Sequence, residues 1–340
     1  MKTKVILMYN HKGGTSKTTT LVNLAQELGA RYGKKVLAID NDPQNSLSYL
    51  CNLDINEHSA NESLDGEPHE PYTDENGVRH PAFIPDIGYM QSLFMYEGIM
   101  PEKEDLDSAI VRPKYLTREM EEGKFGWQVK EKEFAFDLLP SYNKGLSMVE
   151  LLYLSASEEP FILRQSNRKY ARYTLKYVVE RIKEFYDYDY ILIDSLPSLG
   201  ILAINGLAAS DSLIICATPD VLSITGLNKV LSNLRELNQF IPNFHILGIM
   251  FSMYAGTKAD DEMIRETKEL AESAGINVFE TRLPRINRMR AMSADEGIAV
   301  TSNTRDFRKY RDAIDRLIEE IFRIEEMNEE NDKKKEGRND

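Results

Sequence analysis

Short apolar runs alternate along this chain with longer stretches in which apolar residues recur every three to four positions. Runs of this kind are typical of strands buried on both faces of a sheet, and the periodic stretches are typical of amphipathic helices. Strands are expected at residues 5–9, 36–40, 134–139, 190–194, 212–217, 245–251 and 277–281. Helices are expected at residues 18–32, 46–51, 104–111, 145–154, 165–186, 201–210, 223–240, 258–274 and 304–327. The alternation predicts an α/β fold with a mostly parallel, twisted sheet and helices on both faces.

Residues 54–80 interrupt this alternation. They hold eight acids against one base, and prolines and glycines break any periodicity. After them come an aromatic, Met-rich segment at 89–96, more typical of a core than of a binding surface, and a charged stretch with the only tryptophan. We therefore predict a single domain over residues 1–328 with an insertion at about 54–133, followed by a charged, disordered tail at 329–340.

Composition limits the classes of protein that fit this pattern. The apolar runs are far shorter than the ~20 residues that span a bilayer, and residues 1–4 lead into the first run without a signal-peptide pattern. The two cysteines, Cys51 and Cys216, lack a Cys-x-x-Cys spacing, so no disulfide framework is expected. These features predict a cytoplasmic protein. The net charge of −13 argues against a uniformly basic nucleic-acid surface but leaves room for a local basic face.

The sequence between the first strand and the first helix is rich in glycine and hydroxyl groups: His-Lys-Gly-Gly-Thr-Ser-Lys-Thr-Thr-Thr at 11–20. A glycine loop between a strand and a helix lets backbone N–H groups surround a phosphate chain, and the helix N-terminus adds partial positive charge. Within this loop Lys17 supplies a full positive charge, and Thr18 supplies a hydroxyl placed to bind Mg²⁺. The loop therefore predicts a site for nucleotide phosphates.

This loop departs from the common phosphate-binding pattern G-x-x-x-x-G-K-[ST]. Counted back from Lys17, the positions of the two glycines hold His11 and Ser16. Two adjacent glycines, preceded by Lys12, stand between them instead. A side chain at Ser16 is tolerated only if its backbone lies outside the region that glycine alone can occupy.

Carboxylates follow two of the expected strands. The second strand leads into Asp-Asn-Asp-Pro-Gln at 40–44, and the strand at 190–194 ends in Asp194, followed by Ser-Leu-Pro-Ser-Leu-Gly. Ligands of open parallel sheets bind at the carboxyl ends of the strands. An apolar strand that ends in aspartate is the Walker B pattern, whose carboxylate orients a water of the Mg²⁺ shell.

Together the three motifs resemble those of the ParA-type plasmid and chromosome partition ATPases, the deviant Walker A proteins of the ParA/MinD superfamily. The resemblance covers about residues 1–55 and 134–310, and the family usually has Cys-Pro-Pro where this sequence has Ser-Leu-Pro. It implies a three-layer P-loop NTPase fold, ATP and Mg²⁺ as cofactors, slow ATP hydrolysis, and a homodimer that forms on ATP binding.

The resemblance also implies roles for individual residues. Lys12 acts in trans on the partner's nucleotide, Lys17 contacts the β- and γ-phosphates, and Asp42 positions the attacking water. The residues implied for the Mg²⁺ shell are Thr18, Asp40 and, through water, Asp194. The residues implied to contact ATP are Lys12, Gly13, Gly14, Thr15, Ser16, Lys17, Thr18, Thr19 and Pro284, with Thr19 reaching the α-phosphate.

Basic residues gather near the last expected strand. Residues 281–311 hold eight bases and three acids, although the whole chain carries a net charge of −13. Such a patch can contact DNA phosphates without reading the bases. The candidate DNA contacts are Arg282, Arg285, Arg288 and Arg290. The resemblance implies non-specific DNA binding by the ATP-bound dimer, stimulation by a ParB-like centromere-binding protein, and association with the nucleoid.

Two other functions stay open from the sequence. A MinD-like membrane-cycling ATPase needs a C-terminal amphipathic helix with a basic face, whereas residues 324–340 hold seven acids against four bases, so no membrane binding is expected. A nucleotide-gated scaffold with little turnover would share the same motifs. Only the rate of hydrolysis separates such a scaffold from an ATPase.

Overall fold

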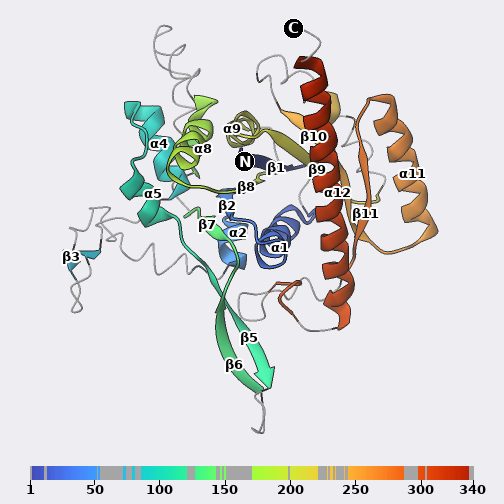
Figure 1. Cartoon of the computed structure of the whole chain (residues 1–340), viewed down its shortest axis with the longest axis horizontal. Helices are drawn as coiled ribbons and strands as arrows, with labels where there is room; N and C mark the ends of the chain where they lie inside the picture. Colours follow the sequence, from blue (N-terminus) through green and yellow to red (C-terminus); the bar gives the residue numbers. More distant parts are fainter. Residues whose placement is uncertain are drawn as a thin grey trace.

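The apolar runs pair as a seven-stranded sheet in the part of the chain that the structure describes (Figure 1). The computed structural model describes residues 2–10, 14–51, 53, 72–73, 79–80, 86–120, 127–142, 146–147, 149–150, 171–197, 200–220, 228, 230–232, 234, 241, 244–286, 298–302 and 305–336. In sheet order the strands are β11 (Val278–Pro284), β10 (His245–Tyr254), β9 (Ser212–Ala217), β1 (Lys4–Tyr9), β8 (Tyr190–Ser195), β2 (Val36–Asn41) and β7 (Asp137–Leu139). All neighbours are parallel, and all seven predicted strands are confirmed.

Helices cover both faces of this sheet, as predicted. On one face, here termed the α1 face, α1 (Lys17–Ala30), α2 (Ser46–Leu50) and α12 (Arg305–Glu336) pack over side chains such as Ile6 and Met8. On the other, the α9 face, lie α4 (Ile87–Glu97), α5 (Lys103–Ala109), α8 (Thr174–Phe185), α9 (Ile201–Ala209) and α11 (Lys258–Ser273). The three-layer α/β fold is therefore confirmed.

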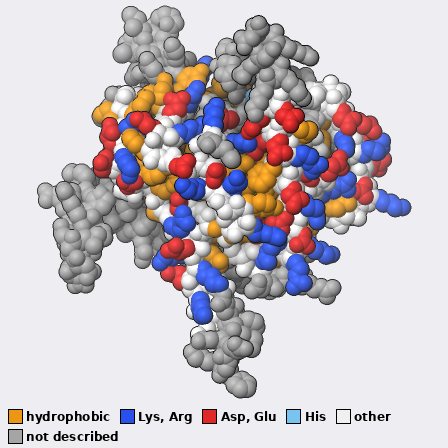
Figure 2. All heavy atoms as spheres, in the orientation of Figure 1, with side chains coloured by type: hydrophobic (Ala, Val, Ile, Leu, Met, Phe, Trp, Pro, Cys, Tyr) orange, Lys and Arg blue, Asp and Glu red, His pale blue; other side chains and the backbone are white. Residues whose placement is uncertain are grey.

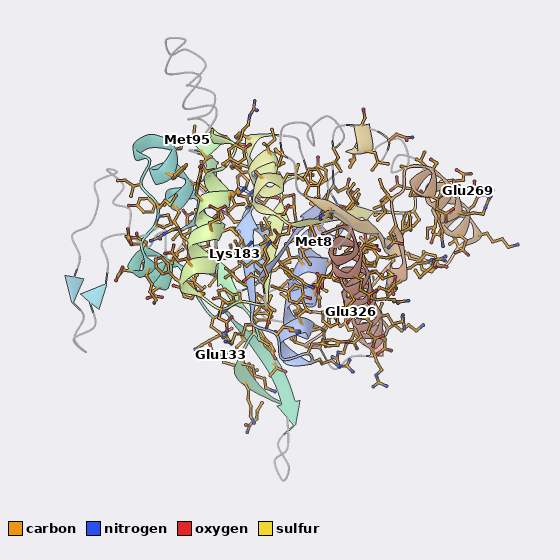
Figure 3. All side chains as sticks on the ribbon, turned by 45° about the horizontal axis from the view of Figure 1, so that its top comes forward. Met8, Met95, Glu133, Lys183, Glu269 and Glu326 are labelled. Atoms are coloured by element: carbon orange, nitrogen blue, oxygen red, sulfur yellow. The ribbon has the colours of Figure 1, made fainter. Side chains whose placement is uncertain are left out.

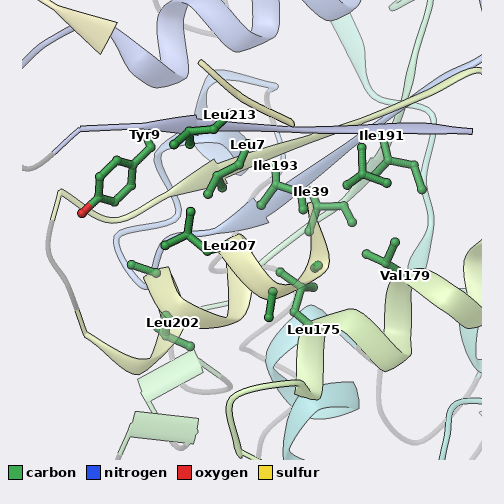
Figure 4. Packing of buried hydrophobic residues seen from close by; sticks show 14 of the residues in the cluster. Leu7, Tyr9, Ile39, Leu175, Val179, Ile191, Ile193, Leu202, Leu207 and Leu213 are labelled. Atoms are coloured by element: carbon green, nitrogen blue, oxygen red, sulfur yellow. The ribbon is translucent and has the colours of Figure 1, made fainter. Parts of the chain in front are cut away.

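Side chains of each strand alternate between these two faces, because successive residues of a strand point to opposite sides. Leu7, Ile39 and Ile193 meet α8 and α9 side chains on the α9 face (Figure 4). Their neighbours Met8 and Ala38 lie on the α1 face. This alternation decides which residues at the ends of β2 and β8 face α1 and which face α9.

Part of the segment at 54–133, predicted as an insertion, packs in the main body. Helices α4 and α5 bury Ile87, Met90, Leu106 and Ala109 in the core of the α9 face, so residues 87–109 belong to the main body. The prediction that the aromatic, Met-rich segment is core is confirmed. Helix α4, in this segment, was not predicted. It packs against both the sheet and α8, so it is apolar on more than one side and shows no single apolar stripe.

A hairpin that the sequence pattern did not predict lies outside the main sheet. Its strands β5 (Lys114–Met120) and β6 (Trp127–Glu133) pair antiparallel and project away from the body (Figure 1). Glu133 marks the base of this hairpin in Figure 3, while Met8 lies within the sheet. Seven of the fourteen residues in the two strands are charged, so the strands show little apolar alternation. A second, two-residue pair consists of β3 (Tyr72–Thr73) and β4 (Arg79–His80).

Helix α12 continues to Glu336, and the structure therefore differs from the disordered tail predicted from residue 329. Lys4 of β1 forms ion pairs with Glu325 and Glu329, both at 3.0 Å, which tie this end of the helix to the sheet. Glu320 accepts hydrogen bonds from the backbone N–H groups of Glu280 and Thr281 and so covers the open edge of β11.

Two further predicted helices, at 145–154 and 223–240, lie largely outside the described residues; the few described positions in them are helical. Of the helices in the described part of the chain, none has the length and apolar character needed to span a membrane.

Candidate nucleotide-binding site

A pocket of about 460 Å³ opens at the carboxyl ends of the central strands. Three segments line it: the loop from β1 to α1, the turn from β2 to α2, and the loop after β8. The lining residues are Gly14, Thr15, Ser16, Lys17, Thr18, Thr19, Asp42, Gln44, Ser46, Tyr49, Leu50 and Pro197. Three sequence motifs that are far apart along the chain therefore meet at one edge of the sheet.

A hydrogen bond from β10 anchors the glycine loop, and the loop enters α1 through Ser16, whose backbone is left-handed. Ser16 has φ 56° and ψ 26°, a conformation that favours glycine but that other residues also adopt, at a cost of ~1 kcal/mol. The Ser252 hydroxyl on β10 donates to Thr15 O at 3.0 Å, which anchors the loop to the sheet. Lys12 and Gly13 lie outside the described residues.

Thr18, which lines the pocket, contacts the fully buried Asp194. The Thr18 hydroxyl donates to Asp194 Oδ2 at 2.6 Å, and the other carboxylate oxygen, Oδ1, is buried without a hydrogen-bond partner. Burial raises the pKa of Asp194 to about 6, although the Thr18 hydrogen bond and the Lys17 charge act to lower it. A buried carboxylate oxygen with unfilled capacity beside a hydroxyl fits a hydrated divalent cation.

Thr18 and Asp194 bring two protein oxygens together here. Among the described residues, no group of three or more His, Cys, Asp and Glu side chains is placed to hold a metal. At nucleotide sites Mg²⁺ takes one or two ligands from the protein and the others from water and phosphate oxygens.

Asp40 lies beside Asp194 in register but is engaged by the protein. Its Oδ2 accepts hydrogen bonds from the Ser48 N–H at 2.8 Å and the Ser48 hydroxyl at 2.7 Å, and its Oδ1 accepts from the Asp42 N–H at 3.3 Å. Burial, and next the Asp194 charge, raise the pKa of Asp40 to about 8. The structure thus gives Asp40 a role in holding the β2–α2 turn, and its place in the Mg²⁺ shell stays a prediction.

Asp42 also lines the pocket. It is 7% exposed, and its Oδ1 accepts from the Gln44 N–H at 2.9 Å. The sequence interpretation missed two neighbours. Tyr49 of α2 lines the pocket, and 62% of its surface is exposed. Its position shortly after Asp-Pro-Gln in the sequence could have indicated that it lies near the site. Burial and the Asp42 charge raise the pKa of Glu150, which no sequence motif marks.

The residues predicted from the last strand lie apart from the pocket lining. Pro284 ends β11 opposite Tyr254 of β10, and the Arg285 N–H donates to Tyr254 O. Arg282, a candidate DNA contact, is paired inside the molecule: Asp261 Oδ1 accepts from its guanidinium at 2.6 Å, and the guanidinium lies 5.1 Å from the Tyr254 ring centroid.

Of the other candidate DNA contacts, Arg285 is exposed. Arg288 and Arg290 lie outside the described residues. The face shown in Figure 2 has basic and acidic side chains interspersed over the body of the molecule.

Comparisons with known proteins agree with this geometry. The model of a family described as "AAA domain" matches residues 3–246. An uncharacterised protein of Methanocaldococcus jannaschii is 30% identical over 270 residues, covering 78% of this chain and 80% of that protein. The chromosome partitioning protein ParA of Caulobacter vibrioides is 25% identical over 283 residues, covering 83% of this chain and 80% of that protein.

Among solved structures, cobyrinic acid a,c-diamide synthase from Mycobacterium smegmatis, with bound ATP analogue and magnesium, has a similar fold. Its TM-score is 0.60 at 21% identity, and the match covers 93% of this chain and 94% of that one. The chain belongs to the AAA-domain family, and its assignment to the ParA-type ATPases of the ParA/MinD superfamily is confirmed.

Proposed function

We propose that this ParA-type ATPase binds ATP with Mg²⁺ in the pocket and hydrolyses it slowly to ADP and phosphate. The observation that carries the proposal is the pair of Thr18 and Asp194, whose free carboxylate oxygen lies next to the hydroxyl at the start of α1. The fold relative solved with an ATP analogue and magnesium supports the choice of ligand.

The proposed chemistry rests on positions around the phosphates. Backbone N–H groups of residues 13–19 and the Lys17 ammonium bind the phosphate oxygens, and Thr18 and Asp194 hold the hydrated cation, which neutralises developing charge. Asp42 accepts a hydrogen bond from the attacking water and orients it. Lys12 of one subunit stabilises charge on the nucleotide of the other.

The proposed biological role is DNA segregation in the cytoplasm. ATP would join two copies of the chain, the dimer would bind DNA without sequence preference, and a ParB-like protein would stimulate hydrolysis. Because Asp261 already pairs with Arg282, the proposal for DNA contacts now rests on Arg285, Arg288 and Arg290. The relative named as the chromosome partitioning protein ParA supports this role.

Asp42→Asn tests the enzymatic part. An amide orients water less well than a carboxylate, so hydrolysis should fall about 100-fold while ATP affinity stays within about threefold. Measurements are phosphate release and equilibrium binding of a fluorescent ATP analogue. Glu104→Gln, an exposed change on α5, is the matched control. Wild-type turnover in Asp42→Asn would remove Asp42 from the mechanism.

Lys12→Ala and a DNA shift assay test the assembly. Lys12→Ala should bind nucleotide but lose either hydrolysis or the ATP-bound dimer, measured by light scattering. Random duplex DNA should shift only with ATP, and the shift should weaken from low to high salt because phosphate contacts release counterions. DNA binding that is equal with and without ATP would contradict nucleotide-gated binding.

A further inference from the structure

A chain of hydrogen bonds lies behind the pocket, on the α9 face. It joins four neutral side chains, all with 0% exposure: Asn41 of β2, Gln91 of α4, Thr174 of α8 and Asn205 of α9. Gln91 Nε2 donates to Asn41 Oδ1 at 3.1 Å. The Thr174 hydroxyl lies 2.8 Å from Gln91 Oε1 and 3.0 Å from Asn205 Oδ1, and Asn205 Nδ2 donates to Ala171 O at 2.8 Å.

Asn41 connects two of the segments that line the pocket. It lies between Asp40 and Asp42, and its amide donates to Leu202 O in the first turn of α9 at 2.9 Å. Helix α9 begins at Ile201, shortly after Pro197 of the pocket lining. A displacement of Asn41 would therefore move the Asp42 turn relative to the loop after β8.

Thr174 is the junction of the network. Its single hydroxyl proton is shared between two amide oxygens, one on α4 and one on α9. Every side-chain oxygen and nitrogen of the four residues has a hydrogen-bond partner within the protein, so any displacement leaves a buried polar atom unpaired. A buried network that is fully satisfied fixes the relative positions of the elements that it joins.

We propose that Gln91, Thr174 and Asn205 are positioning residues for hydrolysis, which hold Asn41 and, through it, the Asp42 carboxylate in place. This inference rests on the proposed function, in which Asp42 orients the attacking water. None of the four network residues lines the pocket, so their effect reaches the reaction through the backbone of β2. Small misplacement of a reacting group lowers the rate far more than it lowers binding.

A matched pair of substitutions at Thr174 tests the proposal in the full-length protein. Thr174→Val removes the hydroxyl and keeps the shape, whereas Thr174→Ser keeps the hydroxyl and loses a methyl group. Turnover at saturating MgATP should fall about tenfold in Thr174→Val, with the ATP dissociation constant within about twofold of wild type. Thr174→Ser should restore turnover to within about twofold of wild type.

Two outcomes would overturn the proposal. One is wild-type turnover in Thr174→Val together with a lower melting temperature, which is what a merely structural role would give. The other is an equal loss of turnover in both variants. If Thr174→Val does not fold, Gln91→Met removes the link to Asn41 with little change in shape and carries the same expectation.

Hydrogen exchange separates failure of this proposal from failure of the proposed function. Backbone amides of residues 42–50 should exchange faster in ATP-bound Thr174→Val than in ATP-bound Thr174→Ser. This readout does not depend on hydrolysis. A wild-type protein that binds ATP without turnover would contradict the proposed function, and equal exchange in the two variants would still overturn the positioning role.

Discussion

Two buried carboxylates on opposite faces of the sheet differ in how many of their oxygens accept hydrogen bonds. Burial raises the pKa of both Asp194, on the α1 face, and Asp86, which caps α4 on the α9 face, to about 6. Asp86 accepts backbone N–H groups on both oxygens, from Tyr89 and from Tyr142, each at 2.7 Å. Asp194 accepts one hydroxyl and keeps one oxygen without a partner. Unfilled hydrogen-bonding capacity, rather than a shifted pKa, therefore distinguishes the candidate functional acid from the structural one.

Asp194→Asn should give the largest effect and separates function from stability. The amide still accepts from Thr18 but lacks the charge that holds a cation, so hydrolysis should fall about 10³-fold, ~4 kcal/mol in the barrier. Removal of a buried charge should raise the free energy of unfolding of the nucleotide-free protein by ~1 kcal/mol. Phosphate release and urea unfolding measure the two effects.

Asp86→Asn is the matched control for that experiment, because it removes a buried carboxylate outside the pocket. Its turnover should stay within about twofold of wild type. Equal losses of turnover in the two variants would show that the comparison between the two acids is wrong.

Substitution of two glycines by alanine should give the next largest effect, on the free energy of unfolding. The two variants compare how tightly the two faces of the sheet are packed. A Cβ on Gly29 of α1 would overlap the backbone oxygen of Ala135, whereas a Cβ on Gly206 of α9 would meet a flexible Leu7 tip at 3.0 Å. Gly29→Ala should lower the free energy of unfolding by ~3 kcal/mol. Gly206→Ala should change it by less than ~1 kcal/mol, since better helix propensity offsets the tight contact. Similar losses in urea unfolding would contradict this difference between the faces.

The strands and the edge that carries the site could be predicted from the sequence. Parallel strands buried on both faces are continuous apolar runs, and their carboxyl ends share one edge, so the glycine loop, Asp42 and Asp194 had to be neighbours. The structure places the glycine loop and Asp42 in the lining of one pocket, and Asp194 contacts that lining through Thr18.

Partners that are distant in sequence could not be predicted. In the sequence Asn41 is only a polar residue between two acids, and its partner Gln91 is 50 positions away on a helix without a clear stripe. In the sequence Arg282 is an unpaired positive charge, and only the fold shows that it forms an ion pair with Asp261. In the hairpin β5–β6 only Tyr115, at its base, packs against the core among the described side chains, and none of these is fully buried. Hydrophobic periodicity marks only elements that bury an apolar face.

The pH dependence of the free energy of unfolding tests the account of Asp86, at a scale of ~3 kcal/mol. Its folded pKa, about 6, lies above the ordinary 3.8, so between these values the folded state keeps a proton that the unfolded state has released. The contribution of Asp86 to stability therefore decreases as pH rises from about 4 to about 6. Asp86→Asn should remove this part of the pH dependence in urea unfolding. An unchanged slope relative to wild type would contradict the assigned burial cost.

The smallest expected effect concerns the strained entrance to α1. The backbone of Ser16 is left-handed, with φ 56°, and its side chain makes no cap hydrogen bond. No capping bond therefore offsets the steric cost of this conformation. Ser16→Gly should therefore raise the free energy of unfolding by about 0.5–1 kcal/mol, and Ser16→Ala, which keeps the Cβ, should not. Urea unfolding of the nucleotide-free protein measures both. If Ser16→Ala gained as much as Ser16→Gly, the hydroxyl rather than the backbone would be the source of the strain, and the left-handed turn of the α1 face would cost the fold nothing.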